Sequence, residues 1–173
     1  FPYTTLFRSH PVSPYGCAKL YAYHLTRNYR KSYKLFASNG ILFNHESPRR
    51  GSNFVTSKVI KTAVEIKLGL ADRLVMGNLD SFRDWGHSRD YVRAMHAILN
   101  HDEPGDFVVA TGQTQSVREL CDMVFKKLGM NYLDYVSQDP KFLRPEELPY
   151  LKGDATKIHN TLGWKPEVTF EEM

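Results

Sequence analysis

Tyr15 and Lys19 are the residues of this chain whose types and spacing best fit proton chemistry. Residues four apart in a helix share one face, and Ser13-Pro14 predicts a helix start, since serine caps helices and proline suits their first position. A nearby ammonium favours the phenolate form of a tyrosine. Such a tyrosine can exchange a proton with a substrate hydroxyl while a hydride moves to a nicotinamide. The spacing alone is equally typical of a solvated pair on a helix surface, so it leaves both interpretations open.

Helical and extended segments alternate along the chain. The apolar spacing and the capping residues predict helices over 13–33, 56–68, 90–100 and 116–128, a shorter helix from Asp154 to Gly163, and a first helical turn at 169–173. Short apolar runs predict strands over 35–43, 73–76 and 106–110, with an edge strand at 132–136 and a loop at 45–53. This alternation is typical of an α/β fold with parallel strand pairing.

Composition excludes several classes of protein. With 42% hydrophobic and 24% charged residues the chain is neither disordered nor collagen-like, and it has no apolar run of the ~20 residues that a membrane span requires. The net charge of +4 is spread over the chain and suits an anionic small ligand as well as nucleic acid. Cys17 and Cys121 cannot build a disulfide framework, which favours a cytoplasmic location. His96 and His101 face different sides of a predicted helix, so no metal site is predicted.

Longer motifs distinguish between the two interpretations of Tyr15 and Lys19. The chain carries Ser13-Pro-Tyr-Gly-Cys-Ala-Lys-Leu-Tyr21, then Asn44-His-Glu-Ser-Pro-Arg-Arg-Gly51, and later Arg83-Asp-Trp-Gly-His87. The first motif resembles the active-site helix of the extended short-chain dehydrogenase/reductases that act on nucleotide sugars. Together the motifs resemble the GDP-mannose 4,6-dehydratase family, over residues 10–173. The segment 44–51 distinguishes that family from the epimerases and the dTDP-glucose dehydratases.

The resemblance implies the C-terminal part of a Rossmann-like parallel sheet, with a smaller lobe for the sugar nucleotide. Residues 10–45 and roughly 84–112 would belong to the Rossmann core, and 46–83 and 113–173 mainly to the substrate lobe, whereas 1–9 resemble a non-native leader. The family's glycine-rich turn, which seats a pyrophosphate on a helix N-terminus, is not found in this sequence. Its Thr-x-Glu pair upstream of the active tyrosine is not found either. We therefore expect a C-terminal fragment that is inactive by itself.

The resemblance also implies an activity for the full-length parent. That activity is the NADP-dependent conversion of GDP-mannose to GDP-4-keto-6-deoxymannose and water, a step towards GDP-fucose and related deoxysugars. The sugar would be oxidised at C4, lose water across C5 and C6, and be reduced at C6, so that the cofactor is regenerated. The family resemblance further implies a homo-oligomer, either a dimer or a tetramer, with no nucleic-acid or membrane partner.

Family roles can be assigned residue by residue where the motifs match. Tyr15 and Lys19 would be catalytic and would also contact the cofactor. His45 and Arg50 would contact NADP, and the planar fork of donors in arginine suits a phosphate. The polar groups expected to hold the GDP moiety are Asn44, Lys58, Arg83 and Arg144. Trp85 and Trp164 are expected to pack in the core.

Two other classes of function stay open at this point. A related nucleotide-sugar epimerase or reductase would share Tyr15 and Lys19 but would not need the segment 44–51. A non-catalytic nucleotide-binding module would need neither. The sequence upstream in the parent gene distinguishes these classes, because only an enzyme of this kind requires a glycine-rich turn and a Thr-x-Glu pair.

Overall fold

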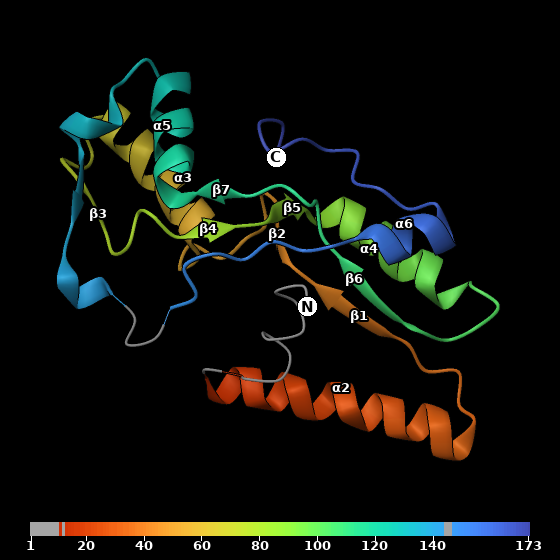
Figure 1. The fold of residues 1–173 in the computed structure, drawn as a ribbon. Helices are drawn as coiled ribbons and strands as arrows, with labels where there is room; N and C mark the ends of the chain where they lie inside the picture. The colour runs from red at the N-terminus through yellow and green to blue at the C-terminus, as the bar shows by residue number, and fades with distance from the viewer. Residues whose placement is uncertain (1–10, 12, 144–146) are drawn as a thin grey trace. The chain divides into compact units, whose positions relative to one another are not determined.

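The computed structural model describes residue 11, residues 13–143 and residues 147–173 (Figure 1). These residues form two units. Unit 1 contains the described residues up to His45 together with Asp84–Gln113 and Leu151–Met173, and unit 2 contains Glu46–Arg83 and Thr114–Tyr150. None of the helices in the described ranges is long and apolar enough to cross a bilayer.

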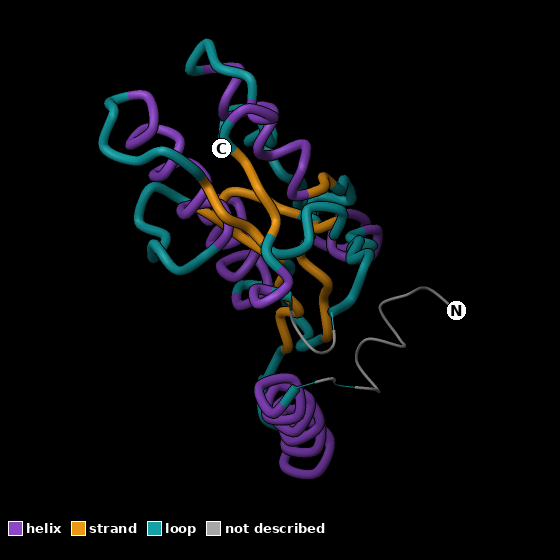
Figure 2. The backbone as a smooth tube through the Cα atoms, turned by 90° about the vertical axis from the view of Figure 1, so that its left-hand side faces the viewer, coloured by secondary structure: helices purple, strands orange, loops and turns teal. Residues whose placement is uncertain are grey.

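Unit 1 is built on two parallel strands with helices on both faces. Its elements are α2 (Pro14–Tyr33), β1 (Asn39–Leu42), β5 (Trp85–His87), α4 (Ser88–Leu99), β6 (Asp106–Val109) and α6 (Thr156–Leu162), and β2 (Asn44–Glu46) ends at the boundary of the two units. Strand β1 pairs with β6 in parallel, with Asn39 opposite Asp106 and Leu42 opposite Val109. In Figure 1, α2 lies on one side of this pair and α4 and α6 on the other, and Figure 2 shows the arrangement turned by 90°.

The core of unit 1 lies on the side of α4 and α6. Its buried members are Tyr91, Ala94, Ile98, Phe107, Val109, Ile158 and Trp164. Helix α2, in contrast, has no buried residue. It is attached to the strands by polar contacts, because Arg30 Nη2 donates to Asp106 Oδ1 at 2.8 Å and Asn39 Nδ2 donates to the Tyr23 carbonyl at 3.4 Å.

Unit 2 pairs two helices with short strands. Its elements are α3 (Val55–Lys67), β3 (Leu74–Met76), β4 (Phe82–Arg83), β7 (Gln115–Ser116), α5 (Val117–Lys127), a 3₁₀ turn at Tyr132–Asp134, β8 (Val136–Gln138) and a second 3₁₀ turn at Pro140–Phe142. Strands β3 and β8 are parallel, β4 and β7 antiparallel, and α3 packs against α5. The predicted capping box is present, because Ser116 Oγ accepts from the Glu119 N–H while the Glu119 carboxylate accepts from the Ser116 N–H.

The α/β class with parallel pairing is confirmed, while several boundaries differ from the sequence-based ones. The strand predicted over 35–43 is restricted to β1, and the loop predicted over 45–53 begins with the end of β2. The edge strand predicted over 132–136 is wrong for its first residues. Asn131 Oδ1 accepts from the Leu133 N–H and caps a 3₁₀ turn there, so β8 begins only at Val136. Asp154 does accept from the Thr156 N–H, but the residue at the cap position of α6 is Ala155.

The segment 151–173 lies in unit 1, whereas the sequence placed 113–173 mainly in the second lobe. Asp90 in α4 provides the reason. Its backbone carbonyl accepts from Trp164 Nε1, and its Oδ2 accepts the N–H groups of Glu167 and Val168. Trp164 and Trp85 are both buried, as predicted for core residues. The assignment of the two units to cofactor and substrate stays a proposal.

Candidate active site

Tyr15 and Lys19 lie one turn apart near the start of α2. The Ser13 hydroxyl caps the helix by accepting from the Gly16 N–H at 3.0 Å, so the helix begins where the sequence predicts. Lys19 Nζ lies 5.5 Å from the centroid of the Tyr15 ring, which confirms that the two side chains share a face. Tyr15 is 71% exposed. The phenol is therefore open to a ligand, with an ammonium beside it.

His45 follows β1 at the carboxyl end of the strand, where parallel sheets bind ligands. Its Nδ1 lies 2.8 Å from the carbonyl oxygen of Phe43, and its ring stacks on Tyr91 with centroids 4.8 Å apart. Because a carbonyl can only accept, this contact assigns the proton to Nδ1 and leaves Nε2 for another partner. Burial, followed by the charges of Asp84 and Asp90, raises the pKa of Tyr91, so the stacking ring is a neutral phenol.

Arg50 lies in the loop between β2 and α3 and is held on two sides. Its Nε lies 3.0 Å from Glu46 Oε2, and its guanidinium carbon lies 3.5 Å from the centroid of the Phe54 ring. Glu46 also accepts a hydrogen bond from Thr56 Oγ1 at 2.7 Å. The guanidinium is thus fixed in one plane, with its terminal nitrogens left over for an anion.

The residues expected to hold GDP have different environments. Asn44 opens β2 and is partly buried. Lys58 in α3 donates to the Val75 carbonyl at 2.7 Å, and its ammonium lies 5.0 Å from the Phe142 ring. Arg144 falls outside the described residues. Among the three described residues of this set, Asn44 is the one whose side chain makes no hydrogen bond with the described part of the chain.

Arg83 is already hydrogen-bonded within unit 2, unlike an arginine whose guanidinium is available to bind a phosphate. Its Nη1 donates to the carbonyls of Phe82 and Leu148, both at 2.8 Å, and its Nη2 donates to Glu147 Oε1 at 3.0 Å. The pair is largely buried, with side-chain exposures of 13% and 22%. A diphosphate would have to compete with Glu147 for this guanidinium.

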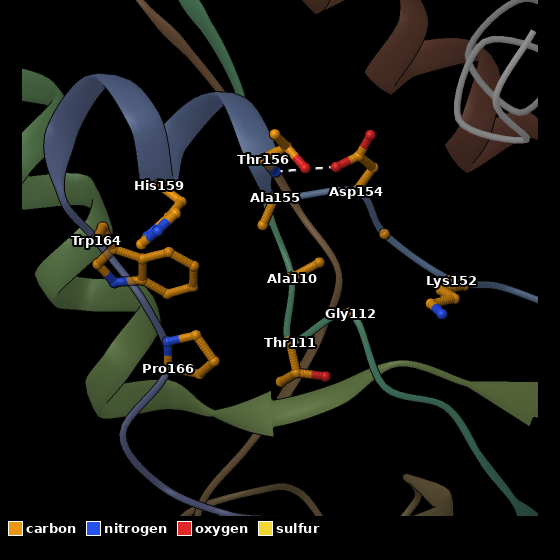
Figure 3. Close-up of a pocket in the computed structure, with 11 residues that line it drawn as sticks. Ala110, Thr111, Gly112, Lys152, Asp154, Ala155, Thr156, His159, Trp164 and Pro166 are labelled. Atoms are coloured by element: carbon orange, nitrogen blue, oxygen red, sulfur yellow. Dashed lines mark hydrogen bonds between the residues drawn. The ribbon is translucent and has the colours of Figure 1, made fainter.

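A cavity of about 360 Å³ in unit 1 is lined by none of the predicted site residues. Figure 3 shows His159, Trp164 and Pro166 along one side of it and Lys152 and Asp154 along the other. The loops that line it are held by Asp84, which is fully buried. Asp84 Oδ1 accepts from both the N–H and the hydroxyl of Thr111, and Oδ2 accepts from the N–H groups of Gly112 and Gly153.

The structure brings together only some of the predicted residues. Tyr15 and Lys19 meet, whereas His45 makes no hydrogen bond or ring contact with either of them within the described residues. Sequence reasoning missed Glu46 and Phe54 at Arg50. The signal was present, since an acid stands four residues before Arg50 and an aromatic residue four after it.

Comparison with known proteins identifies a family. The model of the family described as GDP-mannose 4,6 dehydratase matches residues 2–173. GDP-mannose 4,6 dehydratase 2 of Arabidopsis thaliana is 51% identical over 95% of this chain and 44% of its own length. The human GDP-mannose 4,6 dehydratase is 48% identical over 95% of this chain and 49% of its own length. The chain therefore spans about half the length of the curated relatives it matches.

Solved structures share the same fold. RMD from Pseudomonas aeruginosa, solved in complex with NADPH, superposes with a TM-score of 0.85 at 29% identity, covering 94% of this chain and 54% of that one. The UDP-glucose 4-epimerase of Thermotoga maritima, solved with UDP-glucose, gives a TM-score of 0.81 at 25% identity, covering 94% of this chain and 51% of that one.

Proposed function

Because the chain belongs to the GDP-mannose 4,6-dehydratase family, we propose that the product of the whole gene converts GDP-mannose to GDP-4-keto-6-deoxymannose and water with NADP as cofactor. The observation that carries this proposal is the exposed Tyr15–Lys19 pair within a sequence that matches the family from residue 2 to residue 173. The segment 44–51, which the epimerases do not need, supports a dehydratase over its relatives.

Tyr15 moves the proton in this proposal. In its phenolate form, the Tyr15 oxygen accepts the proton of the sugar C4 hydroxyl as that carbon is oxidised, with the Lys19 ammonium 5.5 Å from the centroid of the Tyr15 ring. The exposed position of Tyr15 leaves room for the sugar next to the hydroxyl. The acid and base steps at C5 and C6 need a carboxylate upstream of Tyr15, which this sequence does not carry, so we expect the 173-residue chain alone to be inactive.

The residues present fit an anionic dinucleotide. NADP, when bound, supplies the hydride acceptor and donor. Lys19 has an exposed ammonium that makes no hydrogen bond with the described residues, His45 leaves Nε2 free, and Arg50 offers the outer edge of a fixed guanidinium. Lys19 would hold a hydroxyl of the cofactor's ribose, and Arg50 a phosphate, for which its fork of donors is suited.

Asn44, Lys58, Arg83 and Arg144 would bind the GDP moiety. Three of the four carry a positive charge, as binding a diphosphate requires. The homo-oligomer and the cytoplasmic location belong to this proposal as well. The cytoplasmic location is supported by Cys17 and Cys121, both of which are free thiols.

The proposal is tested by incubating the product of the whole gene with GDP-mannose and NADP. Mass spectrometry should show the loss of one water from the sugar nucleotide, and absorbance should show no net reduction of NADP. UDP-glucose and dTDP-glucose serve as control substrates. Turnover of UDP-glucose with none of GDP-mannose would contradict the proposal and favour an epimerase-like activity.

A further inference from the structure

The loop that carries Arg50 is folded by two consecutive turns. Arg50 N–H donates to the Ser47 carbonyl at 2.9 Å, with Pro48 at the turn position that its fixed φ favours. Phe54 N–H then donates to the Gly51 carbonyl at 3.1 Å. The first turn brings Arg50 back to Glu46, and the second brings the Phe54 ring back to Arg50. Local backbone geometry therefore places the three side chains against one another.

Glu46 is a buried carboxylate, and Arg50 is the cation with which it forms an ion pair. The Glu46 side chain is 5% exposed and that of Arg50 is 27% exposed. Arg50 Nε makes no in-line hydrogen bond within the described residues, so its contact with Oε2 is an ion pair. Thr56, buried in the first turn of α3, donates to the same oxygen and fixes where the carboxylate points. An anchored, buried charge of this kind holds its partner more rigidly than a solvated one does.

Phe54 fixes the plane of the guanidinium. A guanidinium carbon 3.5 Å from the ring centroid is at stacking distance, and arginine stacks in this way on aromatic faces. With Nε turned to Glu46 and one face on Phe54, the edge that remains is the one with Nη1 and Nη2. Neither of these nitrogens has a hydrogen bond or an ion pair with any described residue. That edge is the one that binds a phosphate through two parallel hydrogen bonds.

We propose that Glu46 and Phe54 are positioning residues that preset the Arg50 guanidinium for a phosphate of the cofactor. This inference rests on the proposed function, because it takes NADP as the molecule that carries the phosphate. The benefit is preorganisation: an arginine held in the binding geometry loses less side-chain freedom when the anion arrives. Glu46 acts on Arg50 through its charge, so an amide of the same shape should not replace it.

The test measures the dissociation constant of NADPH for the product of the whole gene, by calorimetry. Glu46→Ala, Glu46→Gln and Phe54→Leu should each weaken NADPH binding by about tenfold or more, because each removes either the charge or the ring that holds Arg50. The KM for GDP-mannose and the kcat at saturating NADP should be little changed in all three variants. Glu65→Ala is the matched control, since Glu65 forms an exposed pair with Lys61, also four residues away, and should have no effect.

A double-mutant cycle separates positioning from a general structural role. In an Arg50→Met background, Glu46→Ala and Phe54→Leu should cause no further loss of NADPH affinity. Phe54 is 42% exposed, so Phe54→Leu is expected to fold even where Glu46→Ala does not. Two results would contradict the positioning role while leaving the proposed function intact. One is that Phe54→Leu binds NADPH as tightly as wild type does. The other is that Glu46→Ala and Phe54→Leu still lower the NADPH affinity in the Arg50→Met background. A wild-type protein that turns over no GDP-mannose and binds no NADPH would overturn both.

Discussion

The guanidinium of Arg83 donates to the carboxylate of Glu147, with Nη2 3.0 Å from Oε1, although the two residues are 64 apart in the sequence. Arg83 is one of the residues proposed to bind GDP, so Glu147 occupies donors that a diphosphate would use. A diphosphate that binds Arg83 through Nη2 would therefore have to displace the Glu147 carboxylate. Which anion prevails depends on charge and geometry, since a diphosphate carries more charge than one carboxylate.

Glu147→Gln should therefore tighten GDP binding. The amide keeps the size of the side chain but removes the negative charge that competes for Arg83, and we expect the dissociation constant of GDP to fall several-fold in a calorimetric titration. Arg83→Gln should weaken GDP binding. Asp80→Asn is the control, because Asp80 pairs with Arg118 on the surface of unit 2 and neither residue has a proposed role. Unchanged affinity in both Arg83→Gln and Glu147→Gln would remove Arg83 from the proposed GDP site.

Tyr15→Phe should abolish most of the turnover. The substitution keeps the ring but removes the hydroxyl that moves the proton, and general acid–base groups contribute about 10²–10⁴-fold to the rate. We expect kcat for GDP-mannose to fall at least about a hundredfold, with the affinity for GDP-mannose little changed. Tyr21→Phe on the same helix is the matched control, since Tyr21 is also exposed. Turnover of Tyr15→Phe close to that of wild type would show that Tyr15 and Lys19 form only a surface pair without a catalytic role.

Asp84→Asn should destabilise unit 1. The carboxylate receives two donors at each oxygen, and an amide would turn its own N–H groups towards two of them. Lost hydrogen bonds to a charged group and unsatisfied buried donors together should cost about 3 kcal/mol. Urea unfolding monitored by circular dichroism measures this loss. Asp122→Asn breaks an exposed pair with Lys126 and should cost less than about 1 kcal/mol; an equal loss in both variants would contradict the role given to Asp84.

The features that could be predicted from the sequence are those that depend on neighbouring residues. The start of α2 follows from Ser13 and Pro14, and that of α5 follows from the capping box of Ser116 and Glu119. The shared face of Tyr15 and Lys19 follows from helix periodicity alone. In each case the hydrogen bonds or contacts join residues within four positions, so no knowledge of the tertiary fold is required.

The features that could not be predicted depend on distant residues. Arg83 was identified by its motif, but its partner Glu147 is brought to it only by the folding of unit 2. The return of residues 151–173 to unit 1 depends on Asp90, a carboxylate that looks like an ordinary acid in the first turn of α4. Residues 132–136 have an apolar pattern that fits a strand, but the Asn131 side chain competes locally and forms a turn instead.

The stability of unit 1 should decrease at acid pH because of Asp106, the carboxylate that attaches α2 to the strands. Burial alone would raise the pKa of Asp106, but hydrogen bonds from Asn39 and Arg30 and the charges of Arg30 and Arg27 outweigh it and hold the pKa below its ordinary value of 3.8. A carboxyl with a lowered pKa in the folded state contributes stability above its ordinary pKa and loses it as the pH falls towards the folded-state value.

Asp106→Asn tests this contribution. The variant should be less stable than wild type at neutral pH. The difference in unfolding free energy should shrink as the pH falls below about 4, since Asp106 of the unfolded wild-type chain then binds a proton, and the folded-state carboxylate does so only at lower pH. Urea unfolding at a series of pH values measures the difference directly. Arg30→Gln removes one of the donors that lower the pKa, at 2.8 Å from Oδ1, and should reduce the same pH dependence in part. A difference between Asp106→Asn and wild type that stays constant down to acid pH would show that α2 is held by contacts other than this charge.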